Sequence, residues 1–281
     1  MTSMNARRIG FLFALFLLAG CADNRRNLAF EVASGARMSG EWLAAGQTHL
    51  MTWRRIDRPG AELTVYIEGD GFAYETLYRA SADPTPRTQL VLRLAALQQE
   101  GNVAYLARPC MYFEPDRPFP ECRTPLWWTL GRFSEEVVAA MNLAIDDLKK
   151  RAVAEKLHLV GYSGGGAIAA LIAARRTDVA SLRTLAGNLD HEAFTSFHKV
   201  TPLEKSLNPV QVAPKLARLP QIHFVGTKDD IVPGLVVQSF VKAVGEGRCV
   251  RVVEEQGVTH HDGWGDFWAR WHKTMPKCND K

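Results

Sequence analysis

Ser163 stands in the segment Gly-Tyr-Ser-Gly-Gly that begins at Gly161, and its hydroxyl is a candidate nucleophile. Residues 157–160 before the segment are mostly apolar and have strand character, and the Ala/Ile/Leu pattern after it is typical of a helix. A strand that turns abruptly into a helix strains the backbone of the turn residue, and glycines beside it give the necessary space. We predict a Gly-x-Ser-x-Gly turn that presents Ser163 at the carboxyl edge of a sheet; a glycine turn that serves only helix–sheet packing is the alternative.

Catalysis by Ser163 would need further groups around it. A serine hydroxyl is a weak nucleophile at neutral pH, so a base must take its proton and a carboxylate must orient that base. Negative charge develops on the substrate oxygen, and the backbone N–H of Gly164 is a candidate donor to it. The chemistry predicted is acyl transfer to Ser163 followed by hydrolysis, which requires no metal and no organic cofactor.

The chain alternates strand and helix patterns that would bring such groups together. Near-continuous Val, Ile and Leu runs indicate strands that are buried on both faces. Strands are expected at residues 63–67, 103–106, 157–160, 182–186, 221–225 and 250–253, and helices at 88–99, 134–151, 235–244 and from 264 onward, besides the helix after Ser163. The fold class predicted is α/β, with a mostly parallel central sheet and helices on both faces.

The strand, turn and helix around Ser163, set in this alternation, resemble the α/β-hydrolase superfamily over residues 63–272. The resemblance implies an α/β-hydrolase fold and a triad in the chain order Ser, then Asp or Glu, then His. The segment Phe-Val-Gly-Thr-Lys-Asp-Asp-Ile-Val-Pro over 224–233 resembles the acid loop of that family, which selects Asp229 as the acid. Asp230 and Asp190 are the alternatives, and a charged turn at the end of a strand is the non-catalytic interpretation.

The same resemblance assigns the base. Residues 255–264 resemble the histidine loop of the family, a Gly-x-x-His ahead of a helix, and select His260. His261, directly after it, is the alternative. The other histidines lie inside strand patterns or have no motif around them.

The second oxyanion donor is expected in residues 67–72, which occupy the place of the family's His-Gly loop. Glu68 replaces the histidine of that loop. We assign the donor to the backbone N–H of Asp70 or Gly71, acting together with that of Gly164. A simple turn is the alternative.

The function implied is hydrolysis of acyl esters by an esterase or lipase through an acyl-enzyme intermediate. A peptidase or thioesterase could use the same triad, since fold and triad do not fix the leaving group. A hydrolase-like lipoprotein that binds a ligand without turnover is a hypothesis of a different class.

The insert 108–133 contains five aromatic residues: Tyr112, Phe113, Phe119, Trp127 and Trp128. They either roof an acyl pocket as a lid or form the packed core of a disulfide-tied loop.

The first twenty residues have the features of a secretory signal. Two arginines precede an apolar run over 9–18 that is too short to span a bilayer. Leu-Ala-Gly-Cys at 18–21 resembles the lipobox of bacterial lipoproteins, in which the signal is cut before the cysteine and Cys21 carries the lipid. A cleavable signal with a chance cysteine is the alternative. Ala22 favours sorting to the outer membrane, with the protein facing the periplasm.

We divide the chain into a signal peptide, 1–20, a tether with the start of the domain, 21–45, and a hydrolase domain, 46–281, with inserts at 108–133 and 191–219. The 281 residues, 47% apolar and 23% charged, have an ordinary globular composition. The net charge is only +4 and basic residues are scattered, so there is no nucleic-acid footprint. The partners expected are a small-molecule or lipid ester and, through Cys21, the membrane.

Four cysteines remain besides Cys21, and an exported protein can form disulfides between them. Four cysteines allow three pairings. Proximity in the chain favours Cys110–Cys122, which would close a proline-rich loop, and Cys249–Cys278, which would tie the last strand to the tail. A metal site is the alternative, but no Cys-x-x-Cys or clustered histidines accompany these cysteines.

Overall fold

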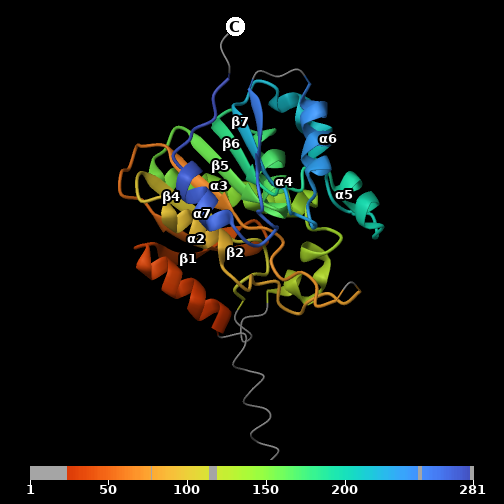
Figure 1. Cartoon of the computed structure of the whole chain (residues 1–281). Helices are drawn as coiled ribbons and strands as arrows, with labels where there is room; N and C mark the ends of the chain where they lie inside the picture. The colour runs from red at the N-terminus through yellow and green to blue at the C-terminus, as the bar shows by residue number, and fades with distance from the viewer. Residues whose placement is uncertain (1–23, 77, 114–118, 246–248, 279–281) are drawn as a thin grey trace, which may run out of the picture.

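The chain is built around one eight-stranded sheet with helices on both sides (Figure 1). This computed structural model describes residues 24–76, 78–113, 119–245 and 249–278. The predicted signal segment and Cys21 therefore lie outside the described residues.

The strands lie in the order β1-β2-β4-β3-β5-β6-β7-β8. The pairs β1–β2 and β2–β4 are antiparallel, and all the other pairs are parallel. The carboxyl ends of the parallel strands share one edge of the sheet, where functional loops gather in α/β folds. The mostly parallel sheet confirms the predicted fold class. The strands are β1 Ser39–Ala45, β2 Thr48–Arg55, β3 Leu63–Ile67, β4 Asn102–Leu106, β5 Leu157–Tyr162, β6 Val179–Leu185, β7 Gln221–Gly226 and β8 Val250–Glu255.

The hairpin of β1 and β2 is not among the strands predicted from the sequence. Both strands mix polar with apolar residues, so neither gives the continuous apolar run of a strand buried on both faces. Gly46, with φ of 66°, makes the tight turn between them. The sheet thus begins at Ser39, inside the segment 21–45 that we describe as the tether and the start of the domain.

The predicted helices lie close to their expected positions, but the helix of residues 24–35 was not predicted and falls within the segment 21–45. Ser134 accepts a hydrogen bond from the N–H of Val137 and caps α3, which has two glutamates in its first turn and three basic residues in its last. Both ends therefore complement the helix dipole, as the sequence predicts. The α-helices are residues 24–35, α2 Leu90–Leu97, α3 Glu135–Ala152, α4 Gly164–Ala173, α5 His191–His198, α6 Gly234–Val244 and α7 Trp264–Trp271, and short 3₁₀ helices are η1 Pro120–Arg123, η2 Pro125–Trp128 and η3 Pro209–Leu216.

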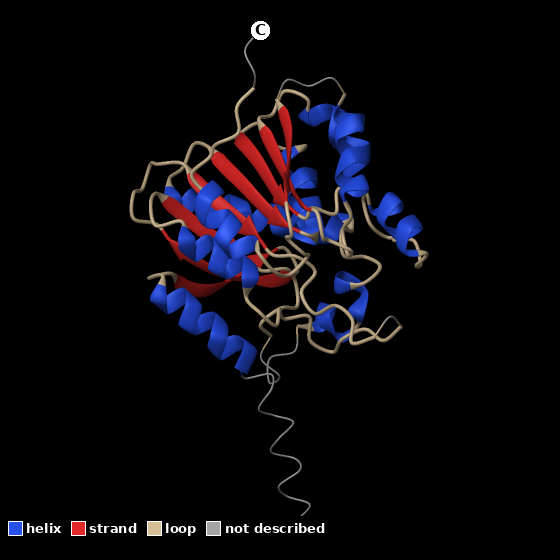
Figure 2. Ribbon diagram, in the orientation of Figure 1, coloured by secondary structure: helices blue, strands red, loops and turns tan. Residues whose placement is uncertain are grey.

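Helices cover both faces of the sheet (Figure 2). An apolar core lies between the sheet and the helices on each face. One core joins the sheet to α3, α4, α6 and η3. The other joins it to residues 24–35, α2 and α7, where Trp264 and Trp268 are fully buried. Burying both faces explains why the central strands consist of apolar residues without alternation.

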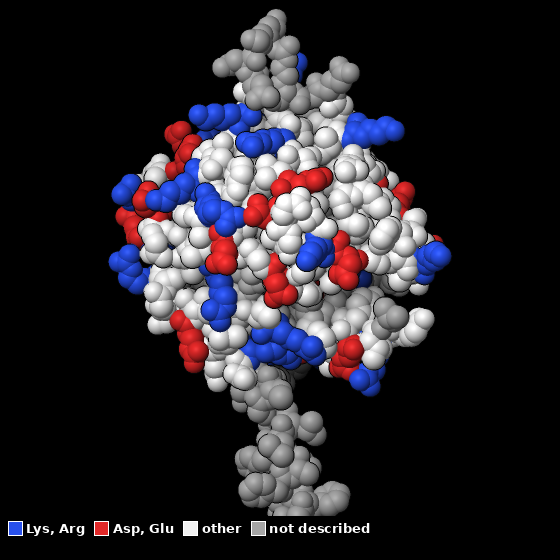
Figure 3. All heavy atoms as spheres, in the orientation of Figure 1, with Lys and Arg blue, Asp and Glu red and all other residues white. Residues whose placement is uncertain are grey.

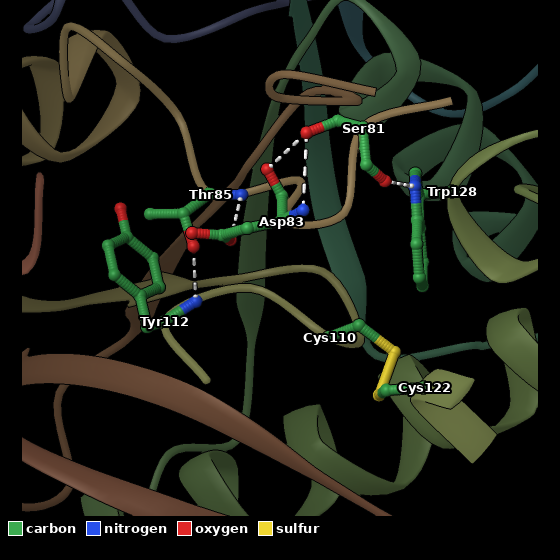
Figure 4. Close-up of a disulfide and its surroundings, with 7 residues drawn as sticks. All are labelled: Ser81, Asp83, Thr85, Cys110, Tyr112, Cys122 and Trp128. Atoms are coloured by element: carbon green, nitrogen blue, oxygen red, sulfur yellow. Dashed lines mark hydrogen bonds between the residues drawn. A yellow bond between two sulfur atoms is a disulfide. The ribbon is translucent and has the colours of Figure 1, made fainter. Parts of the chain in front are cut away.

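The insert 108–133 packs against the loop before α2 (Figure 4). Trp128 is buried beside the disulfide Cys110–Cys122, and its Nε1–H donates to the carbonyl oxygen of Ser81 at 3.0 Å. The N–H of Tyr112 donates to Thr85 Oγ1 at 2.7 Å. These contacts support the interpretation of the insert as a packed, disulfide-tied loop.

Both disulfides favoured by proximity are present, Cys110–Cys122 and Cys249–Cys278.

We expect the paired change Cys110→Ser with Cys122→Ser to lower the free energy of unfolding by about 3 kcal/mol, because the loop without its disulfide gains entropy in the unfolded chain. Urea titration of the variant and the wild type measures this difference. An unchanged free energy of unfolding would show that the link does not constrain the unfolded chain.

Charged side chains of both signs are interspersed over the face shown in Figure 3. This mixture matches the scattered basic residues of the sequence. Among the described residues, no helix combines the length and the apolar character that crossing a membrane requires.

Candidate active site

Ser163 lies at a sharp turn between β5 and α4. Its φ of 51° and ψ of −122° form a strained conformation that is rare outside glycine. A Cβ atom at Gly161 would stand 2.3 Å from the carbonyl oxygen of Gly165, and one at Gly165 would stand 2.2 Å from that of Ile67. Only glycine allows so close an approach of backbone at these two positions. The turn therefore has the tight packing that the sequence predicts.

His260 connects Ser163 and Asp229 through hydrogen bonds. Its Nε2 is 3.1 Å from Ser163 Oγ, and its Nδ1 is 2.8 Å from Asp229 Oδ2. All three residues are buried. They lie in the loops that follow β5, β7 and β8, so the shared carboxyl edge of the sheet brings them together. With its proton on Nδ1, His260 would donate to Asp229 and accept from the serine hydroxyl.

Asp229 is fixed by its own loop. Its Oδ1 accepts the N–H groups of Ile231 at 3.0 Å and Val232 at 2.8 Å, which leaves Oδ2 directed at His260. Asp230, the first alternative, is exposed. Asp190, the second alternative, is occupied elsewhere, because it caps α5.

His261, the alternative base, lies at the edge of the same pocket. Its Nδ1 is 3.3 Å from the hydroxyl of Tyr162, and burial, with the neighbouring His260, lowers its pKa. Tyr162 also donates its hydroxyl to the carbonyl oxygen of His260 at 2.6 Å. That bond fixes the backbone of the histidine loop, so the structure places His260, and not His261, against Ser163.

The predicted oxyanion loop passes alongside the serine. A Cβ atom at Gly69 would lie 3.3 Å from Ser163 Cβ. Within the described residues, the backbone N–H groups of Asp70 and Gly71 make no hydrogen bond. The N–H of Gly164 begins α4 and so has no partner within the helix. None of the three amides assigned from the sequence is therefore hydrogen-bonded within the described residues, and two of the residues, Asp70 and Gly71, line the pocket beside Ser163.

Asp70 carries an ion-pair cluster that sequence reasoning missed. Its carboxylate packs on Gly164, where a Cβ atom would lie 2.1 Å from Asp70 Oδ1. Arg108 Nη1 donates to Oδ1 at 3.3 Å, and Arg132 Nη1 donates to Oδ2 at 2.8 Å. Arg108 also donates to the carbonyl oxygen of Arg132. Two arginines of the insert therefore bind the carboxylate of Asp70 in the predicted oxyanion loop.

Glu68 is the residue that departs from the resemblance noted in the sequence, and its side chain is buried. Its Oε1 accepts the N–H of Gly69 at 2.9 Å, and its Oε2 accepts the hydroxyl of Tyr105 at 2.8 Å. Burial raises the pKa of Glu68 to about 7, against the smaller opposing effect of these hydrogen bonds. The side chain thus orients the peptide that leads into Asp70.

The raised pKa of Glu68 predicts how stability depends on pH. The folded protein keeps this proton up to about pH 7, whereas the unfolded chain loses it near 4.5. The free energy of unfolding should therefore fall, by about 3 kcal/mol from this group, as pH rises between these values. Glu68→Gln stays neutral and should lack that fall when urea titrations at pH 5 and pH 8 are compared. Exposed Glu31→Gln is the control, and a Glu68→Gln profile parallel to wild type would contradict the prediction.

Ser163 and His260 open into a pocket of about 540 Å³. Part of its lining is apolar and comes from four separate segments of the chain: Phe72, Tyr74, Leu90, Phe194, Ile231 and Val232. Polar groups also face it: Arg87, Arg132 and Asn188. Of the insert's described residues, only Arg132 belongs to this lining. The described aromatic side chains of the insert therefore do not roof the pocket.

Among the described residues, no three His, Cys, Asp or Glu side chains are grouped so that they could hold a metal ion.

Solved structures with a similar architecture include two esterases and a peptidase. An esterase of Pyrococcus furiosus, Pf2001, has a TM-score of 0.59 at 11% identity, over 87% of this chain and 94% of its own. Est1E of Butyrivibrio proteoclasticus has a TM-score of 0.57 at 15% identity, over 82% and 94%. The acylaminoacyl peptidase of Pyrococcus horikoshii has a TM-score of 0.59 at 14% identity, over 87% of this chain but 42% of its own.

These similarities are in structure rather than in sequence. No protein-family model matches the chain, and no curated protein matches it in sequence. Together with the strand order and the helices on both faces, the structural neighbours show that the chain has the α/β-hydrolase fold.

Proposed function

We propose that this protein, which has the α/β-hydrolase fold, is a serine hydrolase that cleaves acyl esters. Ser163 is the nucleophile, His260 the general base and acid, and Asp229 the residue that orients His260. The observation that supports this most is the buried hydrogen-bonded chain of these three side chains at the mouth of a pocket. The esterases among the structural neighbours favour ester substrates, while the peptidase keeps amides as the alternative.

The proposed reaction has two halves. His260 Nε2 takes the proton from Ser163 Oγ as this oxygen attacks the substrate carbonyl carbon. The alcohol then leaves with that proton, and the acyl group stays on Ser163. Water attacks the acyl-enzyme, again with His260 as base, and releases the carboxylic acid. Asp229 keeps the proton of His260 on Nδ1 and stabilises the imidazolium in both halves.

The oxyanion is stabilised by the N–H of Gly164 together with that of Asp70 or Gly71. The carboxylate of Asp70 packs on Gly164 and would repel the developing negative charge if it stood alone. Arg108 and Arg132 bind that carboxylate, so the cluster carries one net positive charge. Such preorganised charge beside the oxyanion lowers the barrier to acyl transfer.

The experiment for this proposal is a panel of p-nitrophenyl esters from acetate to palmitate. We expect wild-type protein to release p-nitrophenol from at least one of them, with the preferred chain length reporting the size of the apolar wall. If the protein cleaved peptides or thioesters but none of the esters, ester hydrolysis would be rejected, while the proposed roles of the three triad residues would stand.

For the location, we propose that Cys21 carries a lipid and anchors the protein to the bacterial outer membrane on the periplasmic side. The lipobox sequence before Cys21 supports this. Replacing Cys21 with serine should abolish incorporation of radiolabelled palmitate. Labelling that persists in this variant would refute the proposal.

A further inference from the structure

The pocket beside Ser163 contains two guanidinium groups. Arg132 lines it while holding Asp70, and its side chain keeps 11% of its surface exposed. Arg87, which lies in the segment before α2, also lines it, with its guanidinium carbon 3.5 Å from the centre of the Phe72 ring. Within the described residues, Arg87 forms no ion pair with a carboxylate, so its charge is not cancelled locally.

The two carboxylic acids that line the pocket do not balance these charges. Asp70 is shared between Arg108 and Arg132, so one negative charge meets two positive ones. Both oxygens of Glu68 accept hydrogen bonds from the protein, and burial raises its pKa to about 7. At neutral pH the pocket is therefore positive.

Asn188 gives a second and independent sign of a ligand. It lines the pocket next to Ser163, with its N–H bound to the carbonyl oxygen of Ser163 at 3.0 Å. The residue is only 2% exposed, and its Oδ1 has no hydrogen-bond partner among the described residues. Its Nδ2 likewise bonds to none of them. The unpaired Oδ1 is an acceptor, and burying it unpaired costs about 1–3 kcal/mol unless a ligand donates to it. The Nδ2 group is the part of this side chain that can donate to a ligand acceptor.

These groups favour one kind of ligand. Two guanidiniums and an amide NH₂ offer hydrogen-bond donors and positive charge, and a carboxylate or phosphate offers the matching acceptors. The apolar wall of the pocket accommodates the rest of the molecule.

We infer that the substrate carries an anionic group close to its scissile ester, bound by Arg87, Arg132 and Asn188. The inference rests on the proposed serine hydrolase function and narrows its substrate to anionic esters. A fatty ester without charge would leave the two guanidiniums and the NH₂ group of Asn188 without a charged acceptor.

Two matched pairs of esters test this inference on the full-length protein. Mono-p-nitrophenyl glutarate against p-nitrophenyl valerate places the anion on the acyl side, and 4-carboxyphenyl butyrate against phenyl butyrate places it on the leaving side. In at least one pair we expect kcat/KM to be about 10- to 100-fold higher for the anionic ester than for the neutral one. This ratio corresponds to the free energy of one hydrogen bond to a charged group. The preference should weaken as salt screens the charges.

Variants then connect the preference to the pocket. Arg87→Gln should lower the ratio of the anionic to the neutral ester by about tenfold. Arg79→Gln is the matched control, because Arg79 is exposed and pairs with Glu75 outside the pocket lining. Equal rates within both pairs, or a ratio that Arg87→Gln leaves unchanged, would overturn the inference and leave ester hydrolysis standing. Failure of the wild type to cleave any of the four esters would overturn the proposed function and this inference with it.

Discussion

Replacement of Ser163 by alanine is expected to lower kcat/KM for ester hydrolysis by about 10⁴-fold or more. The variant loses the oxygen to which His260 Nε2 is hydrogen-bonded, so no acyl-enzyme can form. Alanine keeps the Cβ atom and so the same backbone strain as serine at φ of 51°. We therefore expect the free energy of unfolding to change by less than about 1 kcal/mol.

Initial rates with the preferred p-nitrophenyl ester measure this loss, and circular dichroism checks the fold. Ser34→Ala is the matched control, because Ser34 is exposed on the helix of residues 24–35 and far along the chain from the pocket loops. A folded Ser163→Ala variant that retained wild-type rates would exclude Ser163 as the nucleophile.

Asp229→Asn should lower kcat by about 10⁴-fold, the loss typical when the acid of such a triad becomes an amide. The asparagine oxygen can still accept the N–H groups of Ile231 and Val232, so the loop should keep its conformation. Its NH₂ group would then face His260 Nδ1 and force the proton of that ring onto Nε2. His260 could no longer accept the proton of Ser163.

Asp230→Asn is the control for this change, since it makes the same chemical substitution at the exposed neighbour. We expect its kcat to stay within about threefold of wild type, as for surface substitutions away from special features. A large loss in Asp230→Asn with little loss in Asp229→Asn would reverse the assignment of the acid.

The elements that carry strong local patterns were predictable. Ser134 and the two glutamates after it indicate where α3 begins. The glycines around Ser163 indicate a turn so tight that a larger side chain at their positions would collide with neighbouring atoms. Such signals depend on neighbours along the chain, so sequence alone reveals them. The hairpin of β1 and β2 lacks a continuous apolar run, and for that reason it was missed.

The supporting contacts of the site were not predictable, because they join distant parts of the chain. Asp70 pairs with arginines that are 38 and 62 residues away, and no pattern near Asp70 indicates them. Asn188 follows a strand without any motif, and only the fold shows that it shares a pocket with Ser163. The sequence therefore indicated the proposed reacting groups, whereas the structure adds the charges around them.

Covalent labelling with a fluorophosphonate, located by mass spectrometry of peptides, tests the central claim most directly. The account predicts one adduct on Ser163 in the wild type, slower labelling of Asp229→Asn, and none of Ser163→Ala. A folded wild-type protein that stays unmodified, or an adduct on a residue other than Ser163, would contradict it.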